Sequence, residues 1–320
     1  MNDSSATPTW PMMVFWGMSA VSLTVYLVVF VCLLRLRCAS EAFNSTFYSL
    51  LMHHSIADLL TMVFFIATNP MRTLPGIREF YFKYQEFYIT AASYNSVYYF
   101  LYVRCTGIVL LSLQRYCAIC HQTSMITEVY KTNGIFQRIK NASKLQIALV
   151  YWILPTIISI VVLKDVNFSY DTLERMAIIA DQEVIQRNTL MALIVVALTC
   201  IACSLAYGAL FNYIRKNNAG LSKSVRREVN LAFQVFVLLI ALFAILMYYA
   251  FQNYFSQTHN TGPIFYMRAL YPIANGLLSY VNPFCILLLN KDLTRQIFQT
   301  VTCHQYKKVG LANRQLKQKM

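Results

Sequence analysis

Seven apolar runs, each long enough to cross a bilayer, constrain this chain more than any other feature. They cover residues 14–34, 47–67, 88–113, 145–163, 189–214, 230–251 and 266–289. A hydrocarbon core needs about 20 apolar residues per helix, and every backbone amide inside lipid must be bonded within the protein. The sequence therefore predicts an all-α integral membrane bundle of seven transmembrane helices.

Composition points the same way. The chain is 58% hydrophobic and only 12% charged, whereas a soluble domain carries about 25% charged residues. Its net charge of +14 would suggest a nucleic-acid partner in a soluble protein. The basic residues are too unevenly placed along the chain for that interpretation, and no nucleic acid is expected.

The connections between the runs give the expected orientation. If the N-terminus lies outside, the inner segments contain 18 basic and 4 acidic residues, and the outer segments contain 6 basic and 8 acidic residues. Positive charge accumulates on the cytoplasmic side, so we expect the N-terminus outside and the C-terminus inside. The inner segments are 35–45, 117–144, 215–228 and 290–320.

This orientation divides the chain into three parts. Residues 1–13 form an extracellular N-terminus, residues 14–301 the seven-helix domain, and residues 302–320 a cytoplasmic tail. Within the domain, residues 290–301 have the pattern of a short amphipathic helix on the inner membrane face, with Ile297 among the side chains directed toward lipid.

The cysteines are consistent with this topology, whereas the N-x-S/T sequons do not test it. Of four sequons, those at Asn2 and Asn167 lie on the expected outer side and are candidate glycosylation sites, and those at Asn44 and Asn141 lie on the expected inner side. No outer segment contains a cysteine, which excludes an extracellular disulfide. The C-x-x-C spacings at residues 117–120 and 200–203 have apolar flanks and no matching histidine pair, so we expect buried thiols, and neither a metal nor another cofactor.

Two ionisable residues lie deep inside the predicted spans. Asp58 and Arg104 both fall about 16 Å from the inner end of their helices, at 1.5 Å rise per residue. Charged residues at such depth usually face the bundle interior and pair. We predict an intramembrane ion pair between them; the alternative is that each is solvated separately in an internal water cavity.

Arg115 lies at the cytoplasmic border of the third run, in the stretch "SLQRYCAI". A guanidinium cannot lose its charge, and a long side chain at a border can extend into the headgroups. Taken alone, this position favours such an anchor. The surrounding sequence favours another role.

Four motifs, in order, resemble those of rhodopsin-like G-protein-coupled receptors. "QRY" resembles the acid-Arg-Tyr end of their third helix, "HSIADLL" their second-helix aspartate motif, and "NPFCI" their seventh-helix NPxxY, while Trp152 lies midway along the fourth run. Together with "FNSTFYSLL", these stretches resemble the nematode serpentine chemoreceptors, with class V preferred over the related class gamma.

The resemblance implies a receptor in the plasma membrane that binds a small molecule and couples to a heterotrimeric G protein. It implies that Arg115 connects the inner helix ends at rest and contacts the G protein in the active state. We expect Glu228 to be the resting partner, because it is the only acidic residue in the segment 215–228 and lies where the sixth run begins. The remaining switch residues are Tyr116, Asn282 and Pro283. Gln114 replaces the family acid and Ile286 the family tyrosine, so the details of the switch differ.

Polar and aromatic side chains in the outer halves of three runs predict the ligand site. Apolar cups with a few hydrogen-bonding groups are typical small-molecule sites. The candidate ligand-binding residues are Tyr94, Asn95, Tyr98, Tyr102, Tyr249, Gln252, Arg268, Tyr271 and Asn275.

Two other function classes fit the sequence less well. A ligand-gated ion channel or secondary transporter usually carries several ionisable groups along a pathway or helices broken near the midplane, and the chain has neither repeated halves nor a row of charges. An enzyme is not expected, because the chain contains no HExxH motif and no histidine cluster.

Overall fold

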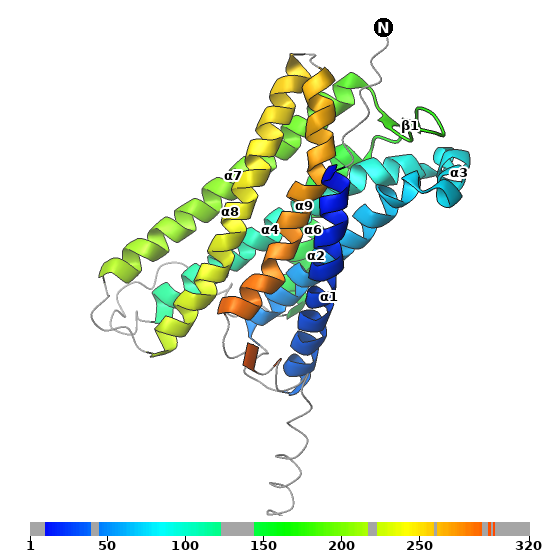
Figure 1. Cartoon of the computed structure of the whole chain (residues 1–320). Helices are drawn as coiled ribbons and strands as arrows, with labels where there is room; N and C mark the ends of the chain where they lie inside the picture. Colours follow the sequence, from blue (N-terminus) through cyan, green and yellow to red (C-terminus); the bar gives the residue numbers. More distant parts are fainter. Residues whose placement is uncertain are drawn as a thin grey trace, which may run out of the picture.

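The computed structural model describes residues 10–39, 45–122, 144–216, 223–258 and 261–289, together with residues 294, 295 and 297. Seven of its helices are long and apolar enough to cross a membrane, which confirms the predicted all-α bundle (Figure 1). They are α1 (Trp10–Ala39), α2 (Thr46–Thr68), α4 (Thr90–Gln122), α6 (Lys144–Leu163), α7 (Gln182–Lys216), α8 (Lys223–Gln257) and α9 (Thr261–Leu289).

Most helices extend beyond their apolar runs. α7 begins at Gln182, whereas hydrophobicity alone predicted residue 189, and α4 continues to Gln122. A helix keeps its own hydrogen bonds in water as well as in lipid, so its polar ends project past the hydrocarbon. Apolar runs locate the spans but underestimate the helices.

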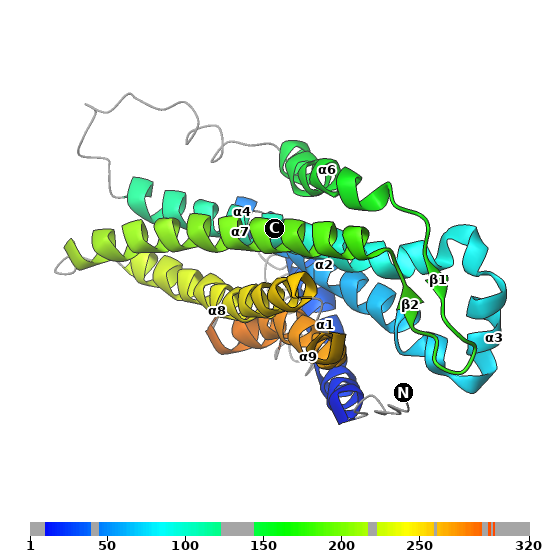
Figure 2. The ribbon, with the colours of Figure 1, turned by 90° about the horizontal axis from the view of Figure 1, so that it is seen from above.

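α4 is the central helix. It packs against α2, α6, α7 and α8, and both views place it among these helices (Figures 1 and 2). It is also the most deeply buried of the seven spans. This position explains why the third run is the least apolar, because side chains that face other helices do not need to be soluble in lipid.

α4 approaches α2 and α6 closely at Gly107. A Cβ atom at this position would lie 2.5 Å from the Tyr151 hydroxyl and 2.6 Å from Nδ1 of His54. These two groups also contact each other, with 3.1 Å between Nδ1 of His54 and the Tyr151 oxygen. Any larger residue at this position would therefore force the Tyr151 and His54 side chains to shift.

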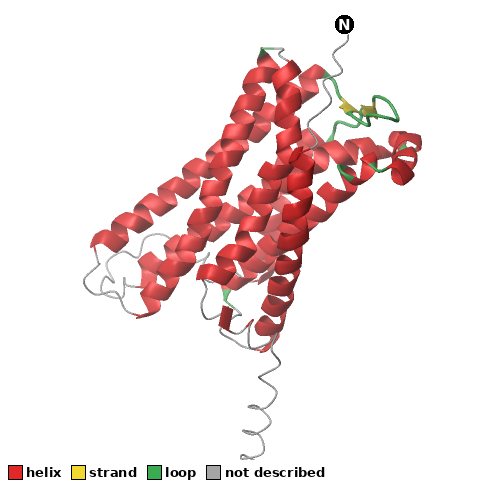
Figure 3. Ribbon diagram, in the orientation of Figure 1, coloured by secondary structure: helices red, strands yellow, loops and turns green. Residues whose placement is uncertain are grey.

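We call the end of the bundle where α1 begins the outer end, and the opposite end the inner end. The outer end carries short elements that hydrophobicity did not predict (Figure 3). They are η2 (Met71–Thr73), α3 (Pro75–Lys83), η3 (Gln85–Ile89), β1 (Ser169–Tyr170) and β2 (Ile178–Ile179). The two strands pair antiparallel, with Ser169 opposite Ile179, and the hairpin lies beside α3 in both ribbon views (Figures 1 and 2).

Candidate functional site

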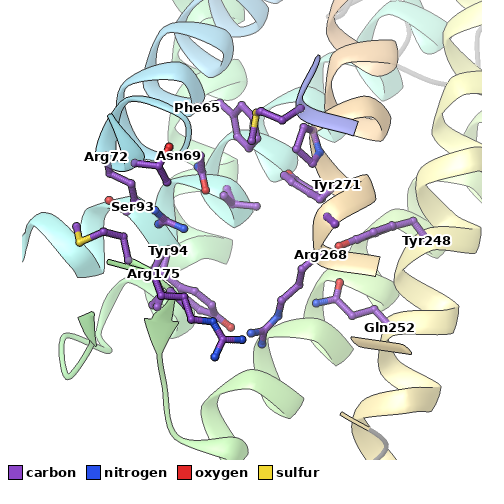
Figure 4. Close-up of a pocket in the computed structure, with 18 of the residues that line it drawn as sticks. Phe65, Asn69, Arg72, Ser93, Tyr94, Arg175, Tyr248, Gln252, Arg268 and Tyr271 are labelled. Atoms are coloured by element: carbon purple, nitrogen blue, oxygen red, sulfur yellow. The ribbon is translucent and has the colours of Figure 1, made fainter. Parts of the chain in front are cut away.

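A cavity of about 550 Å³ opens at the outer end of the bundle (Figure 4). Helices α1, α2, α4, α8 and α9 form its walls, and the segment before β2 closes one side. Its volume lies in the range of sites for small organic molecules. Aromatic side chains supply much of the lining, namely Trp16, Phe65, Tyr94, Tyr98, Tyr248, Tyr249 and Tyr271.

Six of the nine predicted ligand-binding residues line this cavity. They come from three helices, two from α4, two from α8 and two from α9, and are Tyr94, Tyr98, Tyr249, Gln252, Arg268 and Tyr271. Tyr94 and Tyr98 lie one turn apart, with their hydroxyl oxygens 3.3 Å from each other. Two of the three tyrosines that the spacing of four residues selected on α4 therefore line the cavity, and their role in ligand binding stays a prediction.

The other three predicted residues do not line the cavity. Asn95 is buried and its Nδ2 donates to the carbonyl oxygen of Asp165 at 2.9 Å. Tyr102 packs in the core between α4, α7 and α8. Asn275 is buried one turn below Tyr271, where it binds Arg104. Tyr102 and Asn275 lie one helical turn deeper than the lining residues Tyr98 and Tyr271, so they are below the cavity, whereas Asn95 points in another direction around α4.

Hydrogen bonds, rather than a disulfide, hold the loop between α6 and α7 against α4 and η3. Asn95 binds the loop at Asp165, and the backbone NH of Tyr170 donates to Oε1 of Gln85 at 2.8 Å. Arg187 on α7 forms a salt bridge with Asp165. The loop thus reaches the cavity at Met176, whose side chain is buried and whose φ of 51° lies in the left-handed region.

Two cavity arginines were missed by the sequence analysis. Arg72 lies in η2 just past α2, and Arg175 lies in the loop before β2. Both fall outside the apolar runs, in connections that contributed only to the charge count. No spacing rule joins them to Arg268, so only the folded loops bring the three together.

Below the cavity, Arg104 binds α9 rather than Asp58. Its Nη2 donates to Oδ1 of Asn275 at 2.6 Å, and its Nη1 donates to the Ser279 hydroxyl at 2.7 Å. Its side chain is only 1% exposed. Two neutral acceptors one turn apart on α9 therefore bind this buried guanidinium.

Asp58 lies in a second group of polar contacts. Its carboxylate accepts a 2.6 Å hydrogen bond from the Tyr26 hydroxyl, and Nε2 of His54 lies 3.7 Å from the same oxygen. The Tyr26 hydroxyl in turn accepts from Nδ2 of Asn282 at 3.0 Å, and Oδ1 of Asn282 accepts from Gln234 at 3.3 Å. These contacts connect α1, α2, α8 and α9.

The predicted direct ion pair is therefore wrong. Within the described part of the chain, no salt bridge joins Asp58 to Arg104, although the two charges remain close enough to interact electrostatically. Equal depth fixes a position along the helix axis only. Around the axis, α9 supplies the acceptors for Arg104, whereas Tyr26 on α1 and His54 on α2 supply the contacts of Asp58.

Arg115 is buried at the inner end and does not extend into the headgroups. Its side chain is 1% exposed, and its guanidinium carbon lies 3.1 Å from the centre of the Phe47 ring. Tyr116 packs beside it against Leu210 and Ala232. The side chain of Glu228 lies outside the described side chains, so its contact with Arg115 stays a prediction.

The remaining predicted switch residues lie in α9. Asn282 is fully buried in the polar contacts described above, and Pro283 lies inside the helix without ending it. Most of the predicted eighth helix, residues 290–301, lies outside the described residues. Ile297, expected to point to lipid, is instead buried in the core cluster that includes Phe47 and Ile286.

The structure describes one of the two predicted glycosylation sites. Asn167 is exposed in the loop between α6 and β1, where an oligosaccharide has room. Asn2 lies outside the described residues, as do the other residues of the 1–13 segment that precede Trp10. Glycosylation at both sites stays a prediction.

Seven helices long and apolar enough to cross a membrane, with an outer aromatic cavity and buried polar contacts beneath it, define a multi-pass integral membrane protein. The family described as serpentine type 7TM GPCR chemoreceptor Srv matches residues 15–303, and the chain belongs to this family. The match confirms class V, the first choice of the sequence analysis. A search of the curated proteins found no match.

Proposed function

We propose that this protein is a chemosensory receptor of the plasma membrane. It binds an environmental small molecule in the outer cavity and signals through a heterotrimeric G protein on its inner side. The family supports the receptor class, and the size and aromatic lining of the cavity support a small organic ligand.

One observation carries the proposal: a single helix contributes both to the cavity and to the buried polar contacts. On α9, Tyr271 lines the cavity, and Asn275, Ser279 and Asn282 follow at intervals of four, four and three residues. Residues at this spacing share one helix face. A ligand that shifts or rotates α9 at Tyr271 therefore acts directly on the contacts with α4 and α1.

The ligand changes the population of two states of the bundle. Polar contacts between helices have discrete partners, so a small displacement of α9 exchanges one set of hydrogen bonds for another. A ligand that binds the second arrangement more tightly increases its population in proportion to that difference in affinity. At the inner end, the second arrangement frees Arg115 to contact the G protein.

Nucleotide exchange tests the proposal. Purified receptor in lipid vesicles is screened with small organic molecules while exchange on an added G protein is recorded. A compound that accelerates exchange with the wild type, and not with a Tyr271→Ala variant, supports the proposal. Ligand-evoked current in vesicles without G protein, with no effect on exchange, would identify the chain as a channel instead.

A further inference from the structure

The charge of the cavity lining is entirely positive. Among the described lining residues, Arg72, Arg175 and Arg268 carry charge, and no aspartate or glutamate is present. They come from three separate segments, η2, the loop before β2, and α9. Guanidinium groups that converge on one cavity repel one another and are a common binding arrangement for carboxylate, sulfate and phosphate groups.

A nearby carboxylate offsets part of this charge. The distance from Oδ2 of Asp171 to Nε of Arg175 is 3.7 Å. Asp171 also acts electrostatically on Arg72. Its other oxygen accepts hydrogen bonds from the backbone NH groups of Thr172 and Ala177, which fix it within the loop. One carboxylate that is engaged with the loop backbone leaves the three guanidinium groups with an excess of positive charge.

Arg72 retains unused hydrogen-bonding capacity. Its guanidinium lies over the Tyr170 ring, 5.6 Å from the ring centre. Its Nε and Nη1 atoms are buried and have no hydrogen-bond partner within the described part of the chain. A buried charged donor without an acceptor is costly, and an anionic group in the cavity would supply that acceptor.

Arg268 and Arg175 direct their charged ends toward each other. Figure 4 shows the two side chains entering the cavity from α9 and from the loop, with their guanidinium groups converging. For Arg268, the structure contains no hydrogen bond or salt bridge to another described residue. Two like charges that converge are stabilised when an anion lies between them.

The remaining lining suits an apolar body. Phe65 and Tyr271 pack together with ring centres 5.8 Å apart, and Tyr98 and Tyr249 have ring centres 6.4 Å apart. Gln252 adds a neutral polar group that is 6% exposed. The cavity therefore combines three arginines with aromatic walls.

We infer that the ligand of this cavity is a small organic anion, with a carboxylate, sulfate or phosphate group held by Arg268, Arg72 and Arg175 and an apolar body held by the aromatic walls. The inference rests on the proposed function only for the claim that the cavity receives the stimulus. Binding itself requires no G protein, so the two claims can be tested separately.

Thermal stabilisation of purified receptor measures binding directly. The probes are phenylacetate, phenyl sulfate and phenyl phosphate, compared with neutral phenylacetamide and cationic phenethylamine. A ligand that binds the folded state raises the melting temperature in a concentration-dependent way. We expect stabilisation by the anions alone. In Arg268→Gln, the concentration needed for half of the effect should rise at least about tenfold, as expected for a lost hydrogen bond to a charged group.

Two further variants separate binding from folding. Arg268→Lys retains the charge and should retain most of the stabilisation, and Lys83→Gln, which removes a cation at the end of α3 outside the cavity lining, should respond as the wild type does. Equal stabilisation by the amide or the amine, stabilisation by no anion, or an unchanged response of Arg268→Gln would each overturn the inference. Because the readout is not signalling, these outcomes leave the G-protein proposal untouched.

Discussion

The hydroxyl group of Tyr26 donates a 2.6 Å hydrogen bond to the carboxylate of Asp58. The Tyr26 hydroxyl oxygen also accepts a 3.0 Å hydrogen bond from Nδ2 of Asn282, so one tyrosine on α1 connects α2 to α9. Both neighbours are 0% exposed. Asp58 does not contact Arg104 directly. Tyr26 instead links the Asp58 carboxylate to α9 through two hydrogen bonds.

Replacement of this tyrosine should destabilise the receptor. Tyr26→Phe removes the donor to Asp58 and the acceptor for Asn282, which leaves two buried polar groups unsatisfied at a cost of about 1–3 kcal/mol each. We expect a lower melting temperature of the purified protein. Tyr254→Phe is the matched control, because Tyr254 is 60% exposed. An equal effect of the two substitutions would show that the contact contributes nothing.

Substitution of Gly107 should separate α4 from its neighbours. In a helix interior, alanine is normally more stable than glycine by about 1 kcal/mol. At Gly107 the added methyl group collides with His54 and Tyr151, whereas at Gly208 it meets no described atom within 4 Å. Gly107→Ala should therefore lower the melting temperature and Gly208→Ala should leave it equal or higher. Similar behaviour of both variants would contradict this packing.

The charges of Asp58 and Arg104 should be coupled although they do not touch. Loss of one buried charge removes part of the electrostatic compensation of the other, at a cost below the roughly 3–5 kcal/mol of breaking a direct buried ion pair. Asp58→Asn and Arg104→Gln should each reduce surface expression, and the double variant should be expressed better than the sum of the single effects predicts. Flow cytometry of tagged receptor measures this, and additive losses would mean that each charge depends only on its own hydrogen bonds.

Glycosylation tests the orientation of the bundle. With the N-terminus outside, the exposed Asn167 receives an oligosaccharide, and Asn167→Gln loses the gel shift that glycosidase treatment removes. Asn2→Gln should remove a second shift. The sequon at Asn141 lies on the expected inner side and is the internal control. A gel shift that is lost in Asn141→Gln but kept in Asn167→Gln would show that the orientation is the opposite one.

Hydrophobic patterning predicted the seven spans because lipid imposes one simple requirement on every helix. It could not predict α3 or the β1–β2 hairpin, since short polar segments outside the bilayer have no such requirement. The same difference separates Arg268 from Arg175. Arg268 lies on a predicted helix face beside Tyr271, whereas the position of Arg175 depends on how Asn95 and Gln85 hold the loop.

The ion-pair error has a related cause. Sequence gives the depth of Asp58 and Arg104 along their helices, but their partners depend on how the neighbouring helices are rotated, α1 for Asp58 and α9 for Arg104. Asn275 and Ser279 are ordinary polar residues within an apolar run, and nothing in their spacing identifies them as acceptors for Arg104. Only the packed bundle shows that they face it.

The central claim is that ligand binding at the outer end changes how the inner end contacts a G protein. Arg115 and Glu228 are the residues proposed to make this change. If Glu228 holds Arg115 at rest, Glu228→Ala should raise basal exchange about fivefold, the effect of losing a tie of about 1 kcal/mol. Arg115→Ala also removes the group that contacts the G protein, so ligand binding should survive while exchange falls. Its burial over Phe47 argues against a simple anchor.

The most direct measurement is G-protein nucleotide exchange per receptor at the membrane surface, for wild type, Glu228→Ala and Arg115→Ala in the same vesicles. Normalising to receptor number removes differences in folding and insertion. We expect higher basal exchange for Glu228→Ala and little or no exchange for Arg115→Ala, with ligand binding retained in both. Equal exchange by wild type and Arg115→Ala would contradict the account.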